Sequence, residues 1–261
     1  MSSDEAAADA ILAATLIVCR RGRPLADGSE TSPPEILMVK RAAKLRFAGG
    51  AVVFPGGRVD PGDHAVAARF LPGMDPAWGA ALVASIRETL EEAGLLVGLE
   101  KQVGKDEARA ARMALLSGKS FADILDASGW SLTDKAITPY ARWCPPEVVT
   151  RVFDTHFFVT DIGTGNVAVV ADGSESESVF WATAEEILRR SAKGELALVH
   201  PTRRNLQRIA QFTSFADIHA DALAHPPRLI RPYLSESNGK TFIGMPRGHG
   251  YPEEMEPFEP I

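Results

Sequence analysis

The most informative stretch of the sequence is Arg87-Glu88-Thr89-Leu90-Glu91-Glu92-Ala93-Gly94-Leu95. It completes a helix predicted over 77–93, because Gly94 is the residue type that favours a helix C-terminus. The apolar positions of this helix form one buried stripe, and three acids at i, i+3 and i+4 share another side: Glu88, Glu91 and Glu92. Like charges at this spacing weaken an isolated helix by a few tenths of a kcal/mol per pair. A divalent cation among them would relieve the repulsion, since hard cations such as Mg²⁺ take oxygen ligands.

A solvated acidic face is the alternative interpretation of this helix, and two upstream features argue against it. The motif Phe54-Pro55-Gly56-Gly57 ends a short strand predicted over 51–54 in two glycines, where the backbone can approach a ligand closely. Five cations and no acid lie between Ile36 and Val59: Lys40, Arg41, Lys44, Arg46 and Arg58. Arginines beside metal-bound carboxylates suit a phosphate ester. Lys40 and Lys44 are better explained as keeping an edge strand soluble.

Composition excludes several classes of protein. The chain has 261 residues, of which 45% are hydrophobic and 24% charged, as in ordinary globular domains. Its net charge of −6 argues against nucleic-acid binding by bulk positive charge. Two cysteines, Cys19 and Cys144, exclude a disulfide scaffold and a Cys-rich zinc module. The apolar run 10–19 is too short to span a bilayer and follows acids, so we expect no membrane segment and a cytoplasmic protein.

The chain as a whole predicts one α/β domain with helical additions. We expect a leader over 1–9, a single domain over 10–246 and an acidic Gly/Pro-rich tail over 247–261. A helical insertion is predicted over about 104–129, a C-terminal helix over about 201–223, and a loop from 58 to 76. Shorter elements complete the expectation: strands over 15–20, 35–41, 51–54, 137–144, 151–161, 167–170 and 178–182, and a capped helix over 183–190.

With these residues assembled, the chain resembles the nudix hydrolases. The box of that family runs Gly, five residues, Glu, seven residues, then Arg-Glu-U-x-Glu-Glu-x-Gly-U, where U is a bulky aliphatic residue. Gly57, Asp63 and the segment 87–95 match it with three departures. Asp63 replaces Glu, Thr89 stands at an aliphatic position, and 23 residues instead of seven separate Asp63 from Arg87. This 16-residue interruption is typical of the subfamily that resembles mammalian peroxisomal acyl-CoA diphosphatases, and it leaves the role of Asp63 open.

A second signature resembles the coenzyme A-directed members of the family. They carry Leu-Leu-Thr-x-Arg-(Ser/Ala), then Arg, Gly and Phe-Pro-Gly-Gly, each after three residues. This chain matches in register with 37–42, Arg46, Gly50 and 54–57, differing only at Met38 and Val39. The resemblance implies the nudix fold, a mixed β-sheet sandwiched between helices with helical insertions. It also implies Mg²⁺- or Mn²⁺-dependent hydrolysis of the diphosphate bond of CoA or acyl-CoA, giving 3′,5′-ADP and (acyl-)4′-phosphopantetheine.

The resemblance also implies roles for individual residues. Glu91 and Glu92 are expected metal ligands, with Glu88 as a third ligand or the general base. Four further residues complete the expected site: the Gly56 carbonyl on the metal, Arg87 orienting the carboxylates, and Gly50 and Gly57 on the substrate side. Arg41 and Arg46 are expected to hold the 3′-phosphate or the diphosphate oxygens.

A further carboxylate outside the box is expected at Glu177, with Glu175 as second choice. An exposed turn over 173–178 is the competing explanation for both. His156 and His64 are expected to be structural or solvated. Two functional alternatives stay open: a nudix hydrolase for ADP-ribose, NADH or a dinucleoside polyphosphate, and a non-catalytic nudix-fold binding module. The sequence leaves the oligomeric state undecided.

Overall fold

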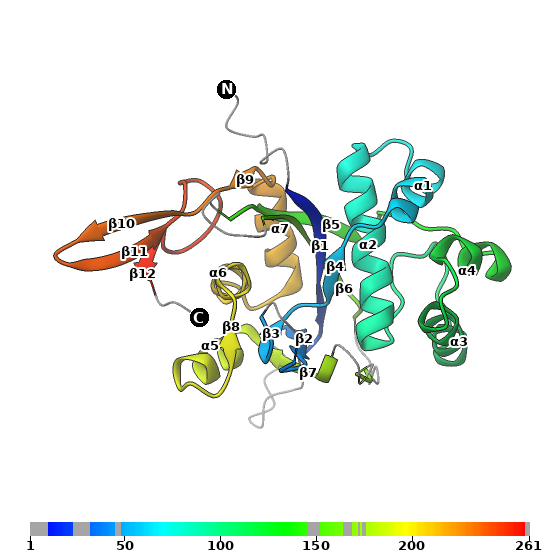
Figure 1. Cartoon of the computed structure of the whole chain (residues 1–261), viewed down its shortest axis with the longest axis horizontal. Helices are drawn as coiled ribbons and strands as arrows, with labels where there is room; N and C mark the ends of the chain where they lie inside the picture. Colours follow the sequence, from blue (N-terminus) through cyan, green and yellow to red (C-terminus); the bar gives the residue numbers. More distant parts are fainter. Residues whose placement is uncertain are drawn as a thin grey trace.

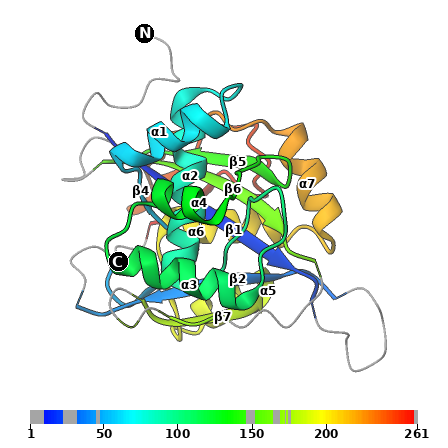
Figure 2. The ribbon, with the colours of Figure 1, turned by 90° about the vertical axis from the view of Figure 1, so that its right-hand side faces the viewer.

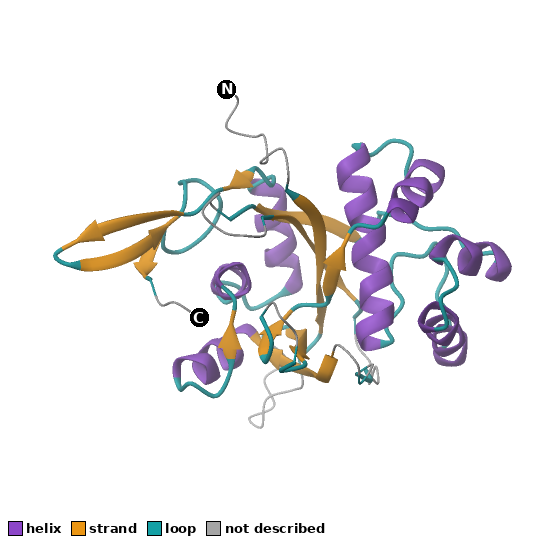
Figure 3. Ribbon diagram, in the orientation of Figure 1, coloured by secondary structure: helices purple, strands orange, loops and turns teal. Residues whose placement is uncertain are grey.

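Two layers of helices enclose a mixed β-sheet (Figures 1 and 3). The computed structural model describes seven stretches of the chain: 10–22, 32–44, 48–145, 152–163, 169–171, 173 and 176–258. The expected leader 1–9 and residues 167–168 of the expected strand 167–170 lie outside them, and residues 169–170 are not in a strand. The architecture is the α/β sandwich with helical additions that the sequence predicts.

The central sheet has the strand order β8-β3-β2-β1-β6-β5-β9, with β4 beside β1 and β7 beside β2. β1 runs parallel to β6 and antiparallel to β2 and β4. Its β-branched and aliphatic residues are buried from both sides, as expected of a central strand. The bounds are β1 Ile11–Arg20, β2 Glu35–Arg41, β3 Ala51–Val53, β4 Gly56–Arg58, β5 Ile137–Trp143, β6 Phe153–Asp161, β7 Ser176–Thr183, β8 Ala197–Leu198 and β9 Leu229–Ile230.

Helix α2 (Pro76–Ala93) covers one face of the sheet and confirms the helix predicted from the glutamate motif. Its stripe of Leu82, Ile86 and Leu90 is fully buried against residues of β1 and β6. Each such side chain contributes roughly 1.5–3 kcal/mol through burial. Three shorter helices lie outside α2 on the same side (Figure 2). They are α1 Pro61–Phe70, α3 Lys105–Leu116 and α4 Phe121–Ser128.

The opposite face of the sheet carries a second core beneath three other helices (Figure 1). Leu206 and Ile218 pack there with Trp143 and Phe157 of the sheet. Thr183 caps the first of these helices as predicted, because its hydroxyl accepts a hydrogen bond from the Glu186 amide at 3.2 Å. The three helices are α5 Ala184–Ala192, α6 His200–Ile209 and α7 Phe215–Ala224.

Two expectations about helices are wrong. The stretch expected to be a loop over 58–76 contains α1, because Pro61 opens the helix while the Asp60 amide donates to the Asp63 carboxylate at 2.8 Å. The single helix expected over 201–223 is two helices, α6 and α7. Ser214 starts α7 by accepting a hydrogen bond from the Asp217 amide at 3.2 Å, which breaks the helical run.

The C-terminal region also differs from the expected acidic tail. Strands β10 (Tyr233–Ser237), β11 (Lys240–Gly244) and β12 (Met255–Pro257) form a separate small sheet. The β10–β11 hairpin turns at Asn238-Gly239, both with positive φ, and projects from the body on the side away from α3 and α4 (Figure 1). The segment behind it returns to α6, where Glu256 is buried.

Glu256 fastens this segment to α6 through three basic side chains. Its carboxylate lies 2.8 Å from Arg203, 3.2 Å from Arg204 and 3.0 Å from His200. Burial alone raises the pKa of Glu256, but these neighbours outweigh burial and lower the pKa to about 2. The segment around Glu256 is therefore held by charge pairing against the helical layer rather than extended into solvent.

No helix in the described ranges has both the length and the apolar character needed to cross a membrane. Cys19 and Cys144 are buried and neither forms a disulfide. Burial, followed by the nearby Asp161, raises the pKa of the Cys19 thiol far above its ordinary value, so this thiol is not a nucleophile.

We predict that Glu256→Gln destabilises the protein by on the order of 2 kcal/mol at neutral pH. The pKa of Glu256 is about 2 in the folded chain and 4.5 ordinarily, so its contribution is complete above pH 4.5 and disappears as the pH falls toward 2. Urea unfolding of both proteins across this range measures the difference. Glu254→Gln is the matched control, because Glu254 pairs with Arg247 in an exposed position and should change stability by less than about 1 kcal/mol. A deficit in Glu256→Gln that stays constant down to pH 2 would contradict the assignment.

Candidate active site

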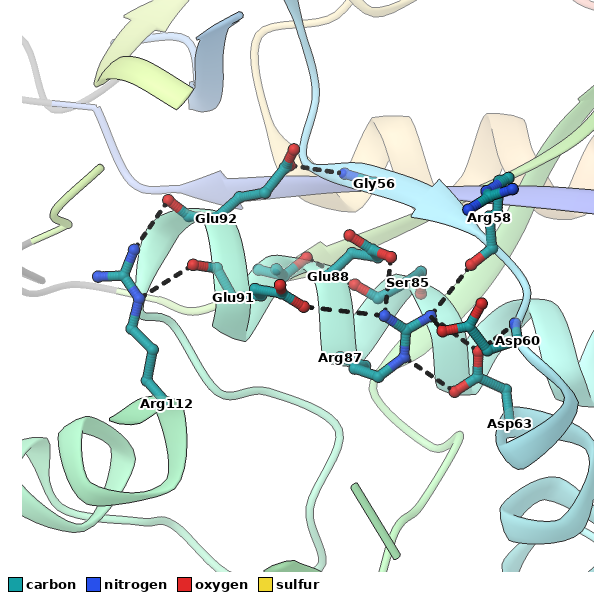
Figure 4. Close-up of polar contacts among 11 residues, drawn as sticks. Gly56, Arg58, Asp60, Asp63, Ser85, Arg87, Glu88, Glu91, Glu92 and Arg112 are labelled. Carbon is teal, nitrogen blue, oxygen red and sulfur yellow. Dashed lines mark hydrogen bonds and ion pairs between the residues drawn. The ribbon is translucent and has the colours of Figure 1, made fainter. Parts of the chain in front are cut away.

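Gly56 and Gly57, the first two residues of β4, lie against the glutamate-bearing side of α2, and Figure 4 shows the contact of Gly56 with Glu92. The Gly56 amide donates a hydrogen bond to Glu92 Oε2 at 3.0 Å. A Cβ added to Gly57 would stand 2.5 Å from Glu88 Cδ, and one added to Gly56 would stand 2.3 Å from the Ala14 carbonyl oxygen. A side chain at Gly56 would collide with the backbone of β1, and one at Gly57 would displace the Glu88 carboxylate, so the two glycines let β4 lie close to both β1 and α2.

Arg87 holds this end of α2 and β4 together. Its Nη1 donates to Glu88 Oε1 at 2.7 Å, and its Nη2 donates to the Arg58 carbonyl at 3.0 Å (Figure 4). Burial lowers the pKa of Arg87, but hydrogen bonds and charge interactions with Asp63 and Glu88 raise it further than burial lowers it. The side chain is only 10% exposed and engaged on three sides. It orients carboxylates and has little surface left for a substrate.

Asp63 is the principal partner of Arg87. The Arg87 Nε and Nη2 atoms donate to its two carboxylate oxygens at 3.0 and 2.9 Å, a bidentate ion pair across 24 residues of sequence. Asp63 is 2% exposed and also accepts from the Asp60 amide. The shorter acid therefore does reach Arg87, because the start of α1 brings its backbone close to α2.

The three glutamates differ in their surroundings. Glu92 is buried, Glu88 is mostly buried, and the Glu91 side chain is 37% exposed, 3.9 Å from Arg87 Nη1. Burial raises the pKa of Glu88 to about 7, against the lowering effect of Arg87. Glu92 and Glu88 therefore lie at Gly56 and Gly57, whereas the Glu91 carboxylate lies beside Arg87, so each acid has a different electrostatic setting.

The donor atoms fit a hard divalent cation. Carboxylate oxygens face a glycine floor that no side chain occupies, which is the oxygen-rich setting that Mg²⁺ and Mn²⁺ prefer. Across the described residues, however, no three acidic, histidine or cysteine side chains already converge on one point. Glu92 is turned to the Gly56 amide and Glu88 to Arg87 instead. Assembling a complete ligand set therefore requires side-chain rotation on α2.

Arg41 stands where β2 parts from β1. β1 pairs with β2 at Cys19 and Arg20 but with β4 at residues 13–15, so the far end of β2, which carries Arg41, diverges there. The buried Arg41 Nε has no hydrogen-bond partner in the described part of the chain. The Gly50 amide, at φ +79°, donates to the Arg41 carbonyl at 3.1 Å. Arg46 lies outside the described residues.

Glu177 is not brought to the α2 glutamates by any contact of the described residues. It lies on β7, and its carboxylate pairs with Lys40 Nζ at 3.0 Å, with the Glu177 side chain 52% exposed. This position agrees better with the competing explanation of a solvated surface acid. Glu175 lies outside the described residues.

The two histidines occupy the positions expected of them. His156 is 1% exposed, packs on the Trp78 ring at 4.2 Å and lies 3.7 Å from Asp154, while His64 is exposed on α1. Sequence reasoning missed Arg112 of α3, which donates to main-chain carbonyls in the last turn of α2. No local motif marks this arginine.

Comparisons with known proteins identify the fold. No protein-family model matches the chain. A crystal structure of a nudix hydrolase from Alicyclobacillus acidocaldarius superposes with a TM-score of 0.67 and 28% identity, covering 81% of this chain and 96% of that one. The fold is therefore that of the nudix hydrolases.

Curated relatives point to one subgroup. Acyl-coenzyme A diphosphatase NUDT19 of Xenopus laevis is 22% identical over 242 residues, covering 73% of this chain. The same protein of Gallus gallus is 24% identical over 281 aligned residues, covering 85% of this chain and 74% of the relative. The chain spans 63% of the length of the Xenopus protein.

We predict that Asp63→Asn destabilises the protein by about 3 kcal/mol, because Arg87 would keep a buried charge without its main partner. Asp60→Asn is the matched control. Asp60 lies 3.6 Å from Arg87 with its side chain 59% exposed, so its loss should cost less than about 1 kcal/mol. Urea unfolding at pH 7 measures both, and equal effects of the two substitutions would refute the central place of the Asp63–Arg87 pair.

Proposed function

We propose, from the premise that this chain is a nudix hydrolase resembling acyl-CoA diphosphatases, that it hydrolyses the diphosphate bond of CoA or acyl-CoA. The products would be 3′,5′-ADP and 4′-phosphopantetheine or its acyl derivative. The observation that carries the proposal is the packing of the Gly56–Gly57 turn against Glu88 and Glu92, beside a buried Arg87. A small anionic substrate and a divalent cation are the partners this site suits.

Glu91, Glu92 and the Gly56 carbonyl would hold Mg²⁺ or Mn²⁺, with Glu88 as a third ligand or as the general base. When bound, such a cation neutralises charge on the diphosphate oxygens and lowers the pKa of the attacking water. Arg87 keeps Glu88 in place from one side, and Asp63 keeps Arg87 in place from the other. The backbone that carries the carboxylates is therefore held in place, and the carboxylates need only side-chain rotation to converge on the cation.

Glu88 is the candidate to accept the proton of the attacking water. The water oxygen forms a bond to one phosphorus, the bond from that phosphorus to the bridging oxygen breaks, and the bridging oxygen leaves with the other phosphate. A base for this step works best with a pKa near the working pH. Burial raises the pKa of Glu88 to about 7 against the lowering effect of Arg87, and a cation bound beside it would lower this pKa again.

Arg41 is the candidate to bind a phosphate of the substrate. Its Nε is buried and without a partner in the described part of the chain, where a buried guanidinium donor is normally satisfied. Phosphate oxygens match the guanidinium fork in both charge and geometry. Arg46, four residues before Gly50, is the second expected cation from the sequence.

Product identification tests the proposal directly. The purified protein is incubated with CoA and Mg²⁺ or Mn²⁺, and we expect mass spectrometry to detect 3′,5′-ADP and 4′-phosphopantetheine. ADP-ribose, NADH and a dinucleoside polyphosphate form the comparison panel. A much higher kcat/KM for one of these than for CoA and acyl-CoA would replace the substrate assignment, and no turnover of any would favour a binding module. We also infer a cytoplasmic location, which two cysteines outside any disulfide support.

We predict that Glu92→Gln lowers kcat at least about a hundredfold while the fold stays intact. Glutamine can still accept the Gly56 hydrogen bond but loses the charge that would bind the cation. The control is Glu100→Gln, an exposed acid beyond the end of α2. Steady-state kinetics and circular dichroism measure both variants, and turnover like that of the wild type in Glu92→Gln would rule out Glu92 as a ligand.

We predict that Arg41→Met raises the KM for CoA about tenfold, since one charged hydrogen-bonding contact is lost. Dephospho-CoA, which lacks the 3′-phosphate, separates the two expected roles. An unchanged KM for dephospho-CoA assigns Arg41 to the 3′-phosphate, and a tenfold increase for both substrates assigns it to the diphosphate. Lys40→Met is the control, because Lys40 is already paired with Glu177. An unchanged KM for CoA in Arg41→Met would show that Arg41 does not bind the substrate.

A further inference from the structure

The C-terminal end of α2 has an unfavourable distribution of charge. The last turns of a helix carry partial negative charge and favour basic side chains, yet α2 has none in its last turn. It carries Glu91 and Glu92 there instead. The carbonyls of this turn also lack partners within the helix, so donors from outside must satisfy them.

Arg112 of α3 supplies both the charge and the donors (Figure 4). Its Nε donates to the Glu91 carbonyl at 3.0 Å and its Nη2 donates to the Glu92 carbonyl at 3.2 Å. One planar group therefore binds two successive carbonyls. The next carbonyl, that of Ala93, accepts from the Val170 amide at 3.1 Å.

The contact is built into the packing of both helices. Arg112 is 9% exposed, and Ala111 beside it is 4% exposed. Gly94 ends α2 at φ +71°, and a Cβ there would lie 3.0 Å from Arg112 Nη1. Gly94 therefore has two functions: it adopts the left-handed conformation that ends α2, and it leaves room for the Arg112 guanidinium.

We propose that Arg112 is a positioning residue for the candidate metal ligands, a role that rests on the proposed function. Both bonds go to main-chain carbonyls, so Arg112 fixes the peptide groups from which the Glu91 and Glu92 side chains extend. A frayed last turn would let the two carboxylates diverge. In this role the inserted helix α3 supports the last turn of α2, which carries two of the candidate metal ligands.

An electrostatic role and a positioning role of Arg112 predict opposite changes in Mn²⁺ affinity when Arg112 is replaced. A cation near a metal site repels the metal, so a purely electrostatic role means that Arg112→Met tightens Mn²⁺ binding. A positioning role means that the same substitution weakens it, and partners outside the ligand set typically contribute 10–100-fold in affinity or activity. The sign of the change therefore separates the two.

The test titrates Mn²⁺ into the full-length protein by isothermal calorimetry, with no substrate present, at a temperature where circular dichroism shows each protein folded. Arg112→Met should raise the Kd for Mn²⁺ about tenfold and lower kcat similarly, with little change in KM. Arg112→Lys keeps the charge but not the two-pronged geometry, and should fall between. Arg109→Met, an exposed arginine one turn earlier on α3, is the matched control and should behave as the wild type.

An unchanged or tighter Kd in folded Arg112→Met overturns the proposal. So does a wild-type Kd in Arg112→Lys, and that variant alone decides if Arg112→Met does not fold. A wild type that binds Mn²⁺ but does not cleave CoA refutes the proposed substrate while leaving this comparison intact. A wild type that binds no Mn²⁺ refutes the metal site itself, and the positioning role with it.

Discussion

The rest of the structure depends on one constraint, which is the close approach of the glycine backbone of β4 to the glutamate-bearing side of α2. Gly56 lets β4 pair closely with β1, because any side chain there would collide with the Ala14 carbonyl, and Gly57 leaves room for the Glu88 carboxylate. β1 in turn is the central strand, paired with β6 along its length. The position of the glutamates is therefore fixed relative to the most buried strand of the molecule, and the freedom left at the site is that of side-chain rotation.

A second constraint explains how a long interruption of the motif is tolerated. Removing Asp63 and Arg87 from water is costly, and only near-ideal geometry offsets that cost. The interruption does not loosen the pair, because it folds as α1 and the first turns of α2, which pack on each other. Gly79 of α2 allows this packing, since a Cβ there would lie 3.3 Å from that of Ala67. An inserted helix keeps its two ends in register, whereas a flexible loop of the same length would not.

Local chemistry explains which features the sequence could predict. Helix α2, the Gly-Gly turn and most central strands follow from periodicity and turn residues over a few neighbours, so they were predictable. Helix α1 was not predictable, because its first residues are Pro, Gly and Asp, which are typical of loops. Its start depends on the hydrogen bond from the Asp60 amide to the Asp63 carboxylate, which the sequence alone does not reveal. The surface position of Glu177 depends on pairing between β2 and β7, and the contact of Arg112 joins segments about 20 residues apart. Neither contact has a local signature.

The arginines show how the molecule separates structural charge from functional charge. Arg87, Arg204 and Arg208 are buried, and each is matched by a carboxylate and by a main-chain carbonyl. Buried guanidinium groups with such partners stabilise contacts between elements and present little charge to a ligand. Arg41 shares an unsatisfied Nε with Arg204 but differs from it in having no carboxylate of the described residues at ion-pairing distance. In a chain of net charge −6, this unpaired cation, at the point where the sheet divides, is the one that the proposed function assigns to a phosphate of the substrate.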